Sequence, residues 1–173
     1  MGSPLTPAQL PGTPGSHVKI VWPKIGKPLT LLCLSRTWVG LWSHWMDGRS
    51  HPCLKPNGCP GCEHEKGNTH WAAYLACWDK LLASKCVLML PKDTVSGSLV
   101  LRDPTADLRG AELSCERLGG RPGGPVSCKI RPSVVVVPND AEEPDTLALL
   151  CKIWSVMFPR TFRPFTLAEG EVA

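Results

Sequence analysis

Residues 44–62 of the chain read HWMDGRSHPCLKPNGCPGC. Cys59 and Cys62 form a C-x-x-C pair in a stretch rich in proline and glycine, and Cys53 lies six positions before that pair. His44 lies nine positions before Cys53, at the end of an aromatic run. Zinc binds thiolates and imidazoles tetrahedrally, and a tight C-x-x-C turn supplies two of its four ligands. The spacing therefore predicts a closed structural zinc site with the ligands His44, Cys53, Cys59 and Cys62.

The identity of the histidine ligand is left open by the spacing. We choose His44 because the alternating run over residues 37–45 predicts a strand that would carry it. His51 and His64 are alternatives, since they lie close in sequence to the cysteines. In each case one imidazole and three thiolates complete the coordination of a single Zn2+ ion.

Two other chemistries use a C-x-x-C pair, and the surrounding sequence argues against both. A thioredoxin-type redox pair sits beside a buried strand and a helix, whereas Cys59 follows Lys-Pro-Asn-Gly and Cys62 precedes a polar run. A zinc deaminase carries H-x-E ahead of its cysteines, and H-x-E occurs nowhere in the chain. A third alternative is that these are unrelated thiols of a loop. Because catalytic zinc keeps an open coordination position and no carboxylate–histidine pair stands near the motif, we expect no enzymatic activity.

Length and composition suit one domain in a reducing compartment. The chain has 173 residues, 43% of them hydrophobic, which is enough for a single core. Its first sixteen residues are polar and proline-rich and do not resemble a signal peptide. No apolar run approaches the roughly 20 residues that a membrane helix needs. We therefore predict a cytoplasmic protein with no membrane partner, whose remaining cysteines include reduced core residues at Cys33, Cys77, Cys115, Cys128 and Cys151.

Short alternating or apolar runs, separated by turn residues, predict a mainly β domain over residues 17–158. We expect residues 1–16 to form a disordered tail and residues 159–173 a flexible one. A late helix begins at Asp145 or Thr146, which can cap it, and carries apolar residues at helical spacing up to Met157. The predicted strands cover residues 17–22, 29–34, 37–45, 71–78, 86–90, 108–118, 126–131 and 134–137.

Several short strands, a metal knuckle between two of them and one C-terminal helix predict a small mixed-β barrel with an inserted zinc lobe at residues 44–68. On the ligand order His44, Cys53, Cys59 and Cys62, the chain resembles the zinc-containing single-stranded DNA-binding proteins of T4-like phages. Their ligands are one histidine followed by three cysteines, the last two as C-x-x-C. The run from Gly110 to Gly120 is similar to a later strand pair of that family, and the likeness covers about residues 28–137. It implies an OB-fold interrupted by a zinc lobe.

Such proteins follow the phosphates with basic side chains and stack bases on aromatic rings. The net charge of +4 and seven tryptophans among 173 residues agree with a polyanionic, base-containing ligand. Period-two alternation places Trp38 and Trp42 on the same strand face as His44, which would hold both indoles in register. The candidate stacking residues are Trp38, Trp42, Trp71 and Tyr74. The candidate phosphate contacts are Arg36, Arg49, Arg109, Arg117, Arg121, Lys129 and Arg131.

The sequence therefore predicts a zinc-stabilised protein that binds single-stranded DNA or RNA without sequence preference. The alternative comes from another functional class: zinc stiffens a docking surface, and the tryptophans bury against a protein partner. Salt dependence separates the two, because counterion release makes nucleic-acid affinity fall steeply as salt rises.

Overall fold

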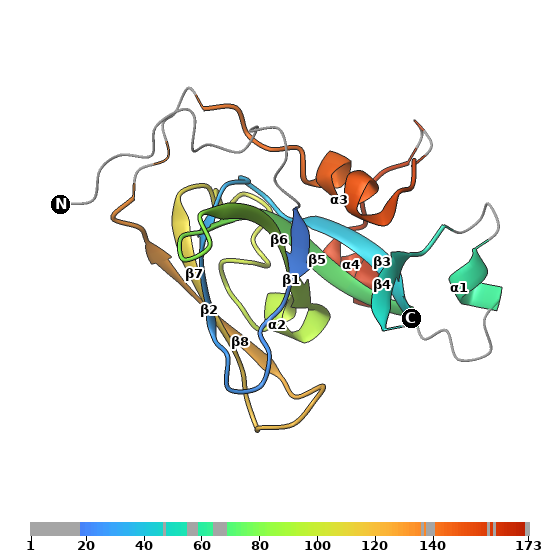
Figure 1. Ribbon diagram of the computed structural model, residues 1–173, viewed down its shortest axis with the longest axis horizontal. Coiled ribbons are helices and arrows are strands. Elements are labelled where there is room, and N and C mark those ends of the chain that lie inside the picture. Colours follow the sequence, from blue (N-terminus) through green and yellow to red (C-terminus); the bar gives the residue numbers. More distant parts are fainter. Residues whose placement is uncertain are drawn as a thin grey trace.

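The computed structural model describes residues 18–46, 48–54, 59–63, 69–135, 137, 141–158, 160 and 162–171. The protein is mainly β, with eight strands in one mixed sheet and a few short helices (Figure 1). The strands are β1 Lys19–Val21, β2 Leu29–Cys33, β3 Val39–Met46, β4 Arg49–Pro52, β5 Thr69–Asp79, β6 Ser84–Pro91, β7 Ala111–Arg117 and β8 Val126–Pro132. The helices are α1 Pro60–Glu63, α2 Lys92–Ser96, α3 Thr146–Trp154 and α4 Leu167–Glu171. None of the helices within the described ranges has the length and apolar character needed to span a membrane.

Strand β5 is the centre of the sheet. One of its edges pairs antiparallel with β6, and the other pairs first with β3 and then with β2. From Trp71 to Trp78 every residue is buried, because both faces of the strand are covered. Trp71 and Leu75 belong to one core cluster and Tyr74 to another on the opposite face. This confirms the strand predicted over residues 71–78.

The remaining strands extend the sheet away from β5. β2 pairs with β7, β7 pairs with β8, and the short β1 runs parallel to β6. β4 pairs only with β3 among the described residues and was not predicted, since residues 49–52 fall within the predicted zinc lobe. Residues 134, 135 and 137, predicted to be in a strand, lie outside the strands. In Figure 1, β2, β7 and β8 lie at one side of the molecule, and α1 projects at the opposite side.

The sequence predicts an OB-like barrel, but over the described residues the sheet is not closed and the barrel is not confirmed. Helix α2, which follows β6 directly in the chain, packs against β5, β6 and β8. Val95 of α2 is fully buried in the larger core cluster. The Thr94 hydroxyl donates a hydrogen bond of 2.8 Å to the carbonyl oxygen of Val126, at the start of β8. Among the described residues, α2 is therefore held against β8 by core packing and a hydrogen bond rather than by strand pairing.

Helix α3 begins where the sequence predicted. The Asp145 carboxylate accepts a 3.0 Å hydrogen bond from the Ala148 N–H, which satisfies one of the free donors of the first turn. Leu150 is completely buried against the Tyr74 face of the sheet. The helix ends earlier than its apolar pattern suggested, because Ser155 adopts a left-handed conformation with φ of 54°. Met157 consequently lies outside the helix and is 92% exposed.

The segment expected to be a flexible C-terminal tail packs against the sheet over residues 162–171. The Phe165 N–H donates to the Gly40 carbonyl at 2.8 Å, and Gly170 lies against the indole of Trp71. Helix α4 is held by a reciprocal cap: the Glu169 N–H donates to the Thr166 hydroxyl and the Thr166 N–H to the Glu169 carboxylate. The predicted disordered tail, residues 1–16, lies outside the described residues.

Candidate metal centre and adjoining cleft

The four predicted metal ligands come together at one end of the sheet. His44 Nε2 lies 3.4 Å from Cys59 Sγ and 3.3 Å from Cys62 Sγ, and Cys53 Sγ lies 3.6 Å from Cys62 Sγ. All four ligand atoms lie within 4.8 Å of one another. Ligand atoms of a tetrahedral zinc ion are about 3.4–3.8 Å apart, given Zn–S near 2.3 Å and Zn–N near 2.0 Å. The cluster could therefore hold a metal ion, and its donor set and spacing fit zinc.

Each ligand is positioned by backbone structure. His44 lies near the end of β3, opposite His51 of β4 and Thr69 of β5. The Cys53 N–H donates to the Trp42 carbonyl at 2.8 Å, which continues the β3–β4 ladder by one step. The N–H groups of Cys62 and Glu63 both donate to the Cys59 carbonyl, which folds the C-x-x-C segment into the turn of α1.

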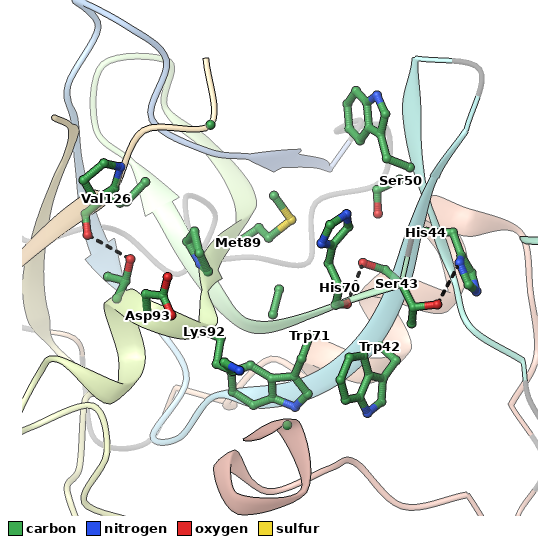
Figure 2. A pocket seen from close by; sticks show the side chains of 18 of the residues that line it. Trp42, Ser43, His44, Ser50, His70, Trp71, Met89, Lys92, Asp93 and Val126 are labelled. Carbon is green, nitrogen blue, oxygen red and sulfur yellow. Dashed lines mark hydrogen bonds between the residues drawn. The ribbon is translucent and has the colours of Figure 1, made fainter. Parts of the chain in front are cut away.

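The imidazole of His44 is oriented by a neighbouring hydroxyl. Its Nδ1 lies 3.4 Å from the Thr69 hydroxyl, and only 1% of the residue is exposed (Figure 2). Such partners fix the orientation of a metal-binding histidine and leave the other ring nitrogen for the metal. Here Nε2 is the atom that faces Cys59 and Cys62.

The surroundings of Cys59 favour its thiolate. Burial raises the pKa of this thiol, but hydrogen bonds from the backbone of Leu54, Cys62 and Gly61 and from the Cys62 side chain outweigh burial and lower the pKa below its ordinary value. Since the thiolate is the form that binds a metal, Cys59 is prepared for coordination.

The structure tests one of the two alternative histidine ligands, His51, but not the other, His64. His51 is not part of the four-residue cluster, and its buried Nε2 has no hydrogen-bond partner among the described residues. His64 lies outside the described residues. His44 is therefore the histidine that the structure brings to the three cysteines.

A cleft of about 590 Å³ adjoins the metal centre. Figure 2 shows His44 at one end of it and Asp93 and Val126 toward the other. It is bounded by the ends of β3, β4, β5 and β6, by α2, by Gly170 of α4 and by the loop of residues 118–125 between β7 and β8, which we call the β7–β8 loop. Its lining includes aromatic, basic and hydroxyl side chains: Trp42, Trp45, Ser50, His70, Trp71, Lys92 and Arg117.

The predicted stacking residues fall into two groups. Tyr74 is 0% exposed, and its hydroxyl donates to the Ser43 hydroxyl at 3.3 Å, so a base cannot reach its ring. Trp71 is 4% exposed, and Trp38 packs edge-on against it while its own Nε1 donates to the Leu101 carbonyl at 2.7 Å. These rings belong to the core because β5 is covered on both faces. Trp42 is partly exposed at the cleft.

The predicted phosphate contacts divide in the same way. Arg109 donates hydrogen bonds to the carbonyls of Leu34 and Ala141. Arg117 donates to the carbonyls of Pro23 and Gly124. Each guanidinium group therefore connects backbone segments that are distant in sequence. Arg36 pairs with Asp107 and Glu143. Three basic residues are exposed at the β7–β8 hairpin: Arg121, Lys129 and Arg131. The side chain of Arg49 lies outside the described residues.

Two residues that line the cleft were not predicted as binding residues from the sequence. Trp45 is 47% exposed and lines the cleft, with Trp22 packed edge-on against it at 5.8 Å. It follows His44 directly on β3, so period two places it on the opposite face of the strand. Lys92 begins α2 immediately after the proline that ends β6. No sequence signal pointed to Lys92, because its position depends on how α2 folds back over the sheet.

Comparisons with protein families, with curated proteins and with solved structures found no match for the chain. Its function therefore has to be inferred from the chemistry of the metal centre and the cleft.

Proposed function

We propose that this is a zinc-stabilised protein that binds single-stranded nucleic acid, without sequence preference, in the cleft beside the metal centre. The ion is Zn2+, since three thiolates and one imidazole at tetrahedral spacing are its usual structural ligands. With four protein ligands the ion has no open position for a substrate, so its role is structural and we propose no enzymatic activity. No disulfide joins any of the nine cysteines among the described residues, which suits a reducing compartment such as the cytoplasm.

The observation that carries the proposal is the position of the cleft in the strand order. If β2 and β3 are counted as one bent strand and the short strands β1 and β4 are left aside, the order β6, β5, β2/β3, β7, β8 supports a five-stranded, partly open Greek-key barrel of the OB type. OB-folds bind oligonucleotides on the face of their second and third strands and between their first and last hairpin loops. The corresponding parts are the β5–β6 face, the metal lobe between β3 and β5, and the β7–β8 loop. All three contribute residues to the cleft.

The side chains of the cleft suit a nucleic-acid strand. Trp45 and Trp42 offer partly exposed indoles, and stacking on such rings is tolerant of sequence because every base has a flat face. Lys92 supplies positive charge at the cleft, and Arg121 extends it along the adjacent loop. The zinc site would keep the ends of β3 and β4 together and so hold Trp45 in place.

The alternative, a zinc-stiffened protein-interaction module, is favoured by one observation. Leu81 and Leu82 form the tip of the turn between β5 and β6 and are 95% and 74% exposed. Two adjacent exposed leucines are typical of a contact with another protein. This tip lies at the opposite end of the β5–β6 hairpin from the cleft-lining residues His70 and Pro91, so it does not compete for the same surface.

A titration of fluorescently labelled single strands of mixed sequence tests the proposal. At low salt we expect binding that quenches tryptophan fluorescence, and a steep loss of affinity as salt rises, because neutralised phosphates release counterions. Duplex DNA of the same length is the control for charge alone. Equal affinity for duplex and single strands, or affinity independent of salt, would favour the interaction module.

A further inference from the structure

Cys115 and Cys128 face each other across the β7–β8 hairpin. They are directly opposite in the strand register, and the Cys115 thiol donates to Cys128 Sγ at a sulfur–sulfur distance of 3.1 Å. The Leu118 N–H donates to the Pro125 carbonyl, which makes that pair a hydrogen-bonded one. Because the two kinds of pair alternate along an antiparallel ladder, Cys115 and Cys128 form a non-hydrogen-bonded pair, whose Cα atoms lie about 4.5 Å apart.

This separation permits a covalent bond. Disulfides join cysteines whose Cα atoms lie about 4.4–6.8 Å apart. The two sulfur atoms already touch, so a bond between them requires only small side-chain rotations and no shift of β7 relative to β8. The same bond would enclose the β7–β8 loop in a covalent ring.

One member of the pair is suited to react first. Cys128 is partly exposed, whereas Cys115 is 1% exposed. The hydrogen bond from Cys115 lowers the pKa of Cys128 below its ordinary value, and the same contact together with burial raises the pKa of Cys115. Thiolate character and access both make Cys128 the attacking sulfur.

The other paired cysteines lack this access. Cys33 and Cys77 are also directly opposite, on β2 and β5, but both are 0% exposed. Cys77 lies opposite Cys86 of β6 as well, and burial raises the pKa of Cys77 well above its ordinary value and that of Cys86 to about 12. These three thiols lie in the core, where a soluble oxidant cannot reach them. They provide a matched control within the same molecule.

We propose that Cys115 and Cys128 form a reversible disulfide by exchange with a small-molecule disulfide such as oxidised glutathione. The Cys128 thiolate attacks one glutathione sulfur, the glutathione S–S bond breaks, and one glutathione leaves as a thiolate that takes up the proton lost by Cys128. Cys115 Sγ then attacks Cys128 Sγ, its proton passes to the second glutathione thiolate as that group leaves, and the protein disulfide is complete. Two cysteine thiols are oxidised, and one glutathione disulfide is reduced to two thiols.

The test is mass spectrometry on the zinc-loaded full chain. The protein is equilibrated with mixtures of reduced and oxidised glutathione, free thiols are alkylated, and the peptides are analysed. We expect a bridged Cys115–Cys128 peptide that disappears when reduced glutathione is in excess, while Cys33 and Cys77 remain fully alkylatable after unfolding. Because the metal ligands also contain thiols, zinc retention is measured in each sample.

Two variants make each outcome informative. In Cys115→Ala the exchange should stop at a glutathione adduct on Cys128, and in Cys128→Ala no adduct should form on Cys115. Free Cys115 and Cys128 under excess oxidised glutathione would overturn the proposal. Equal oxidation of Cys33 and Cys77 would also overturn it, since that would show that the thiols react through unfolding.

Discussion

The ring of His44 lies directly against the backbone of Gly61: a Cβ atom added to Gly61 would stand 2.3 Å from Cδ2 of the imidazole. No real Cβ contact is that short, so the second residue between the two cysteines of the C-x-x-C turn has to be glycine for the imidazole to fit. The histidine ligand and the cysteine turn fit together only because position 61 has no side chain.

Gly61→Ala should therefore weaken metal binding without removing any ligand. The added methyl group pushes the imidazole away from Cys59 and Cys62, and a ligand displaced by even a few tenths of an ångström departs from the preferred zinc geometry. A competition titration with a chromophoric chelator measures the affinity. Glu63→Ala, an exposed change in the same short helix, is the control and should bind like the unaltered protein. Equal affinity for both variants would mean that the contact between Gly61 and His44 does not constrain the site.

Removing the metal should destabilise the fold. The site joins β3, β4 and α1, so its binding free energy contributes to the free energy of unfolding. A loss of only about 3 kcal/mol would lower the Tm by about 6–12 °C in a domain of this size. Calorimetry with and without a chelator measures the change, and Cys59→Ser should show the low Tm with or without added zinc. Cys151→Ser, in α3 away from the site, should retain the response to chelator.

Trp45→Ala should reduce single-strand affinity about tenfold or more while leaving the Tm nearly unchanged. The indole is 47% exposed at the cleft, so it contributes little to the core, and stacking of one base is worth roughly 1–3 kcal/mol. Fluorescence anisotropy with a labelled oligonucleotide measures the loss. Leu99→Ala removes another exposed apolar side chain, away from the cleft lining, and should bind normally. If both variants bind equally well, Trp45 has no role in stacking.

Arg109 and Arg121 should differ in what their loss affects. Arg109→Ala removes hydrogen bonds from a charged group to two backbone carbonyls and should lower the stability by about 2 kcal/mol or more. Arg121→Ala changes an exposed residue of the β7–β8 loop and should leave the Tm unchanged, but should lower the salt dependence of binding by about one released ion. Denaturant unfolding and salt titrations of both variants separate the two roles. A destabilised Arg121→Ala protein would be inconsistent with its exposed position.

Acid should release helix α4 before the rest of the fold. Hydrogen bonds from the Thr166 N–H and hydroxyl, with the Arg163 charge, hold the pKa of Glu169 below its ordinary value. A carboxyl whose pKa is lowered on folding stabilises above its unfolded pKa, and the contribution is lost as pH falls through its folded pKa. Because Gly170 covers Trp71, the loss should appear as a change in tryptophan emission below about pH 4.3. Glu169→Gln should lack this acid transition and start from the less anchored state.

Local sequence patterns predicted the elements whose signals are local. The cap at Asp145, the strand over residues 71–78 and the ligand order of the metal centre all have such signals. The T-x-x-E pattern from Thr166 to Glu169 is also a helix-start signal. The surrounding segment has little apolar periodicity, so the sequence predicts a flexible tail there rather than a helix.

The remaining features depend on tertiary packing and produce no signal in the nearby sequence. An alternating strand looks the same whether its outer face meets water or a second core, so Trp71 and Tyr74 looked like available rings although α4 and α3 cover them. Charge alone likewise does not show that the partners of Arg109 are the carbonyls of Leu34 and Ala141, 75 and 32 residues away. Burial and pairing of this kind are decided by distant segments.

The sheet also implies an order of assembly during synthesis. β3 to β6, with the metal ligands between them, occupy one continuous stretch, Val39 to Pro91, so this part can form its contacts as soon as it leaves the ribosome. β2 can complete its pairing only later in synthesis, because its partner β7 begins at Ala111. Contacts so distant in sequence form slowly, and until then the apolar residues Leu29 to Cys33 lack one of their two neighbours. Early capture of zinc would give the nascent chain a folded half on which the late strands can dock.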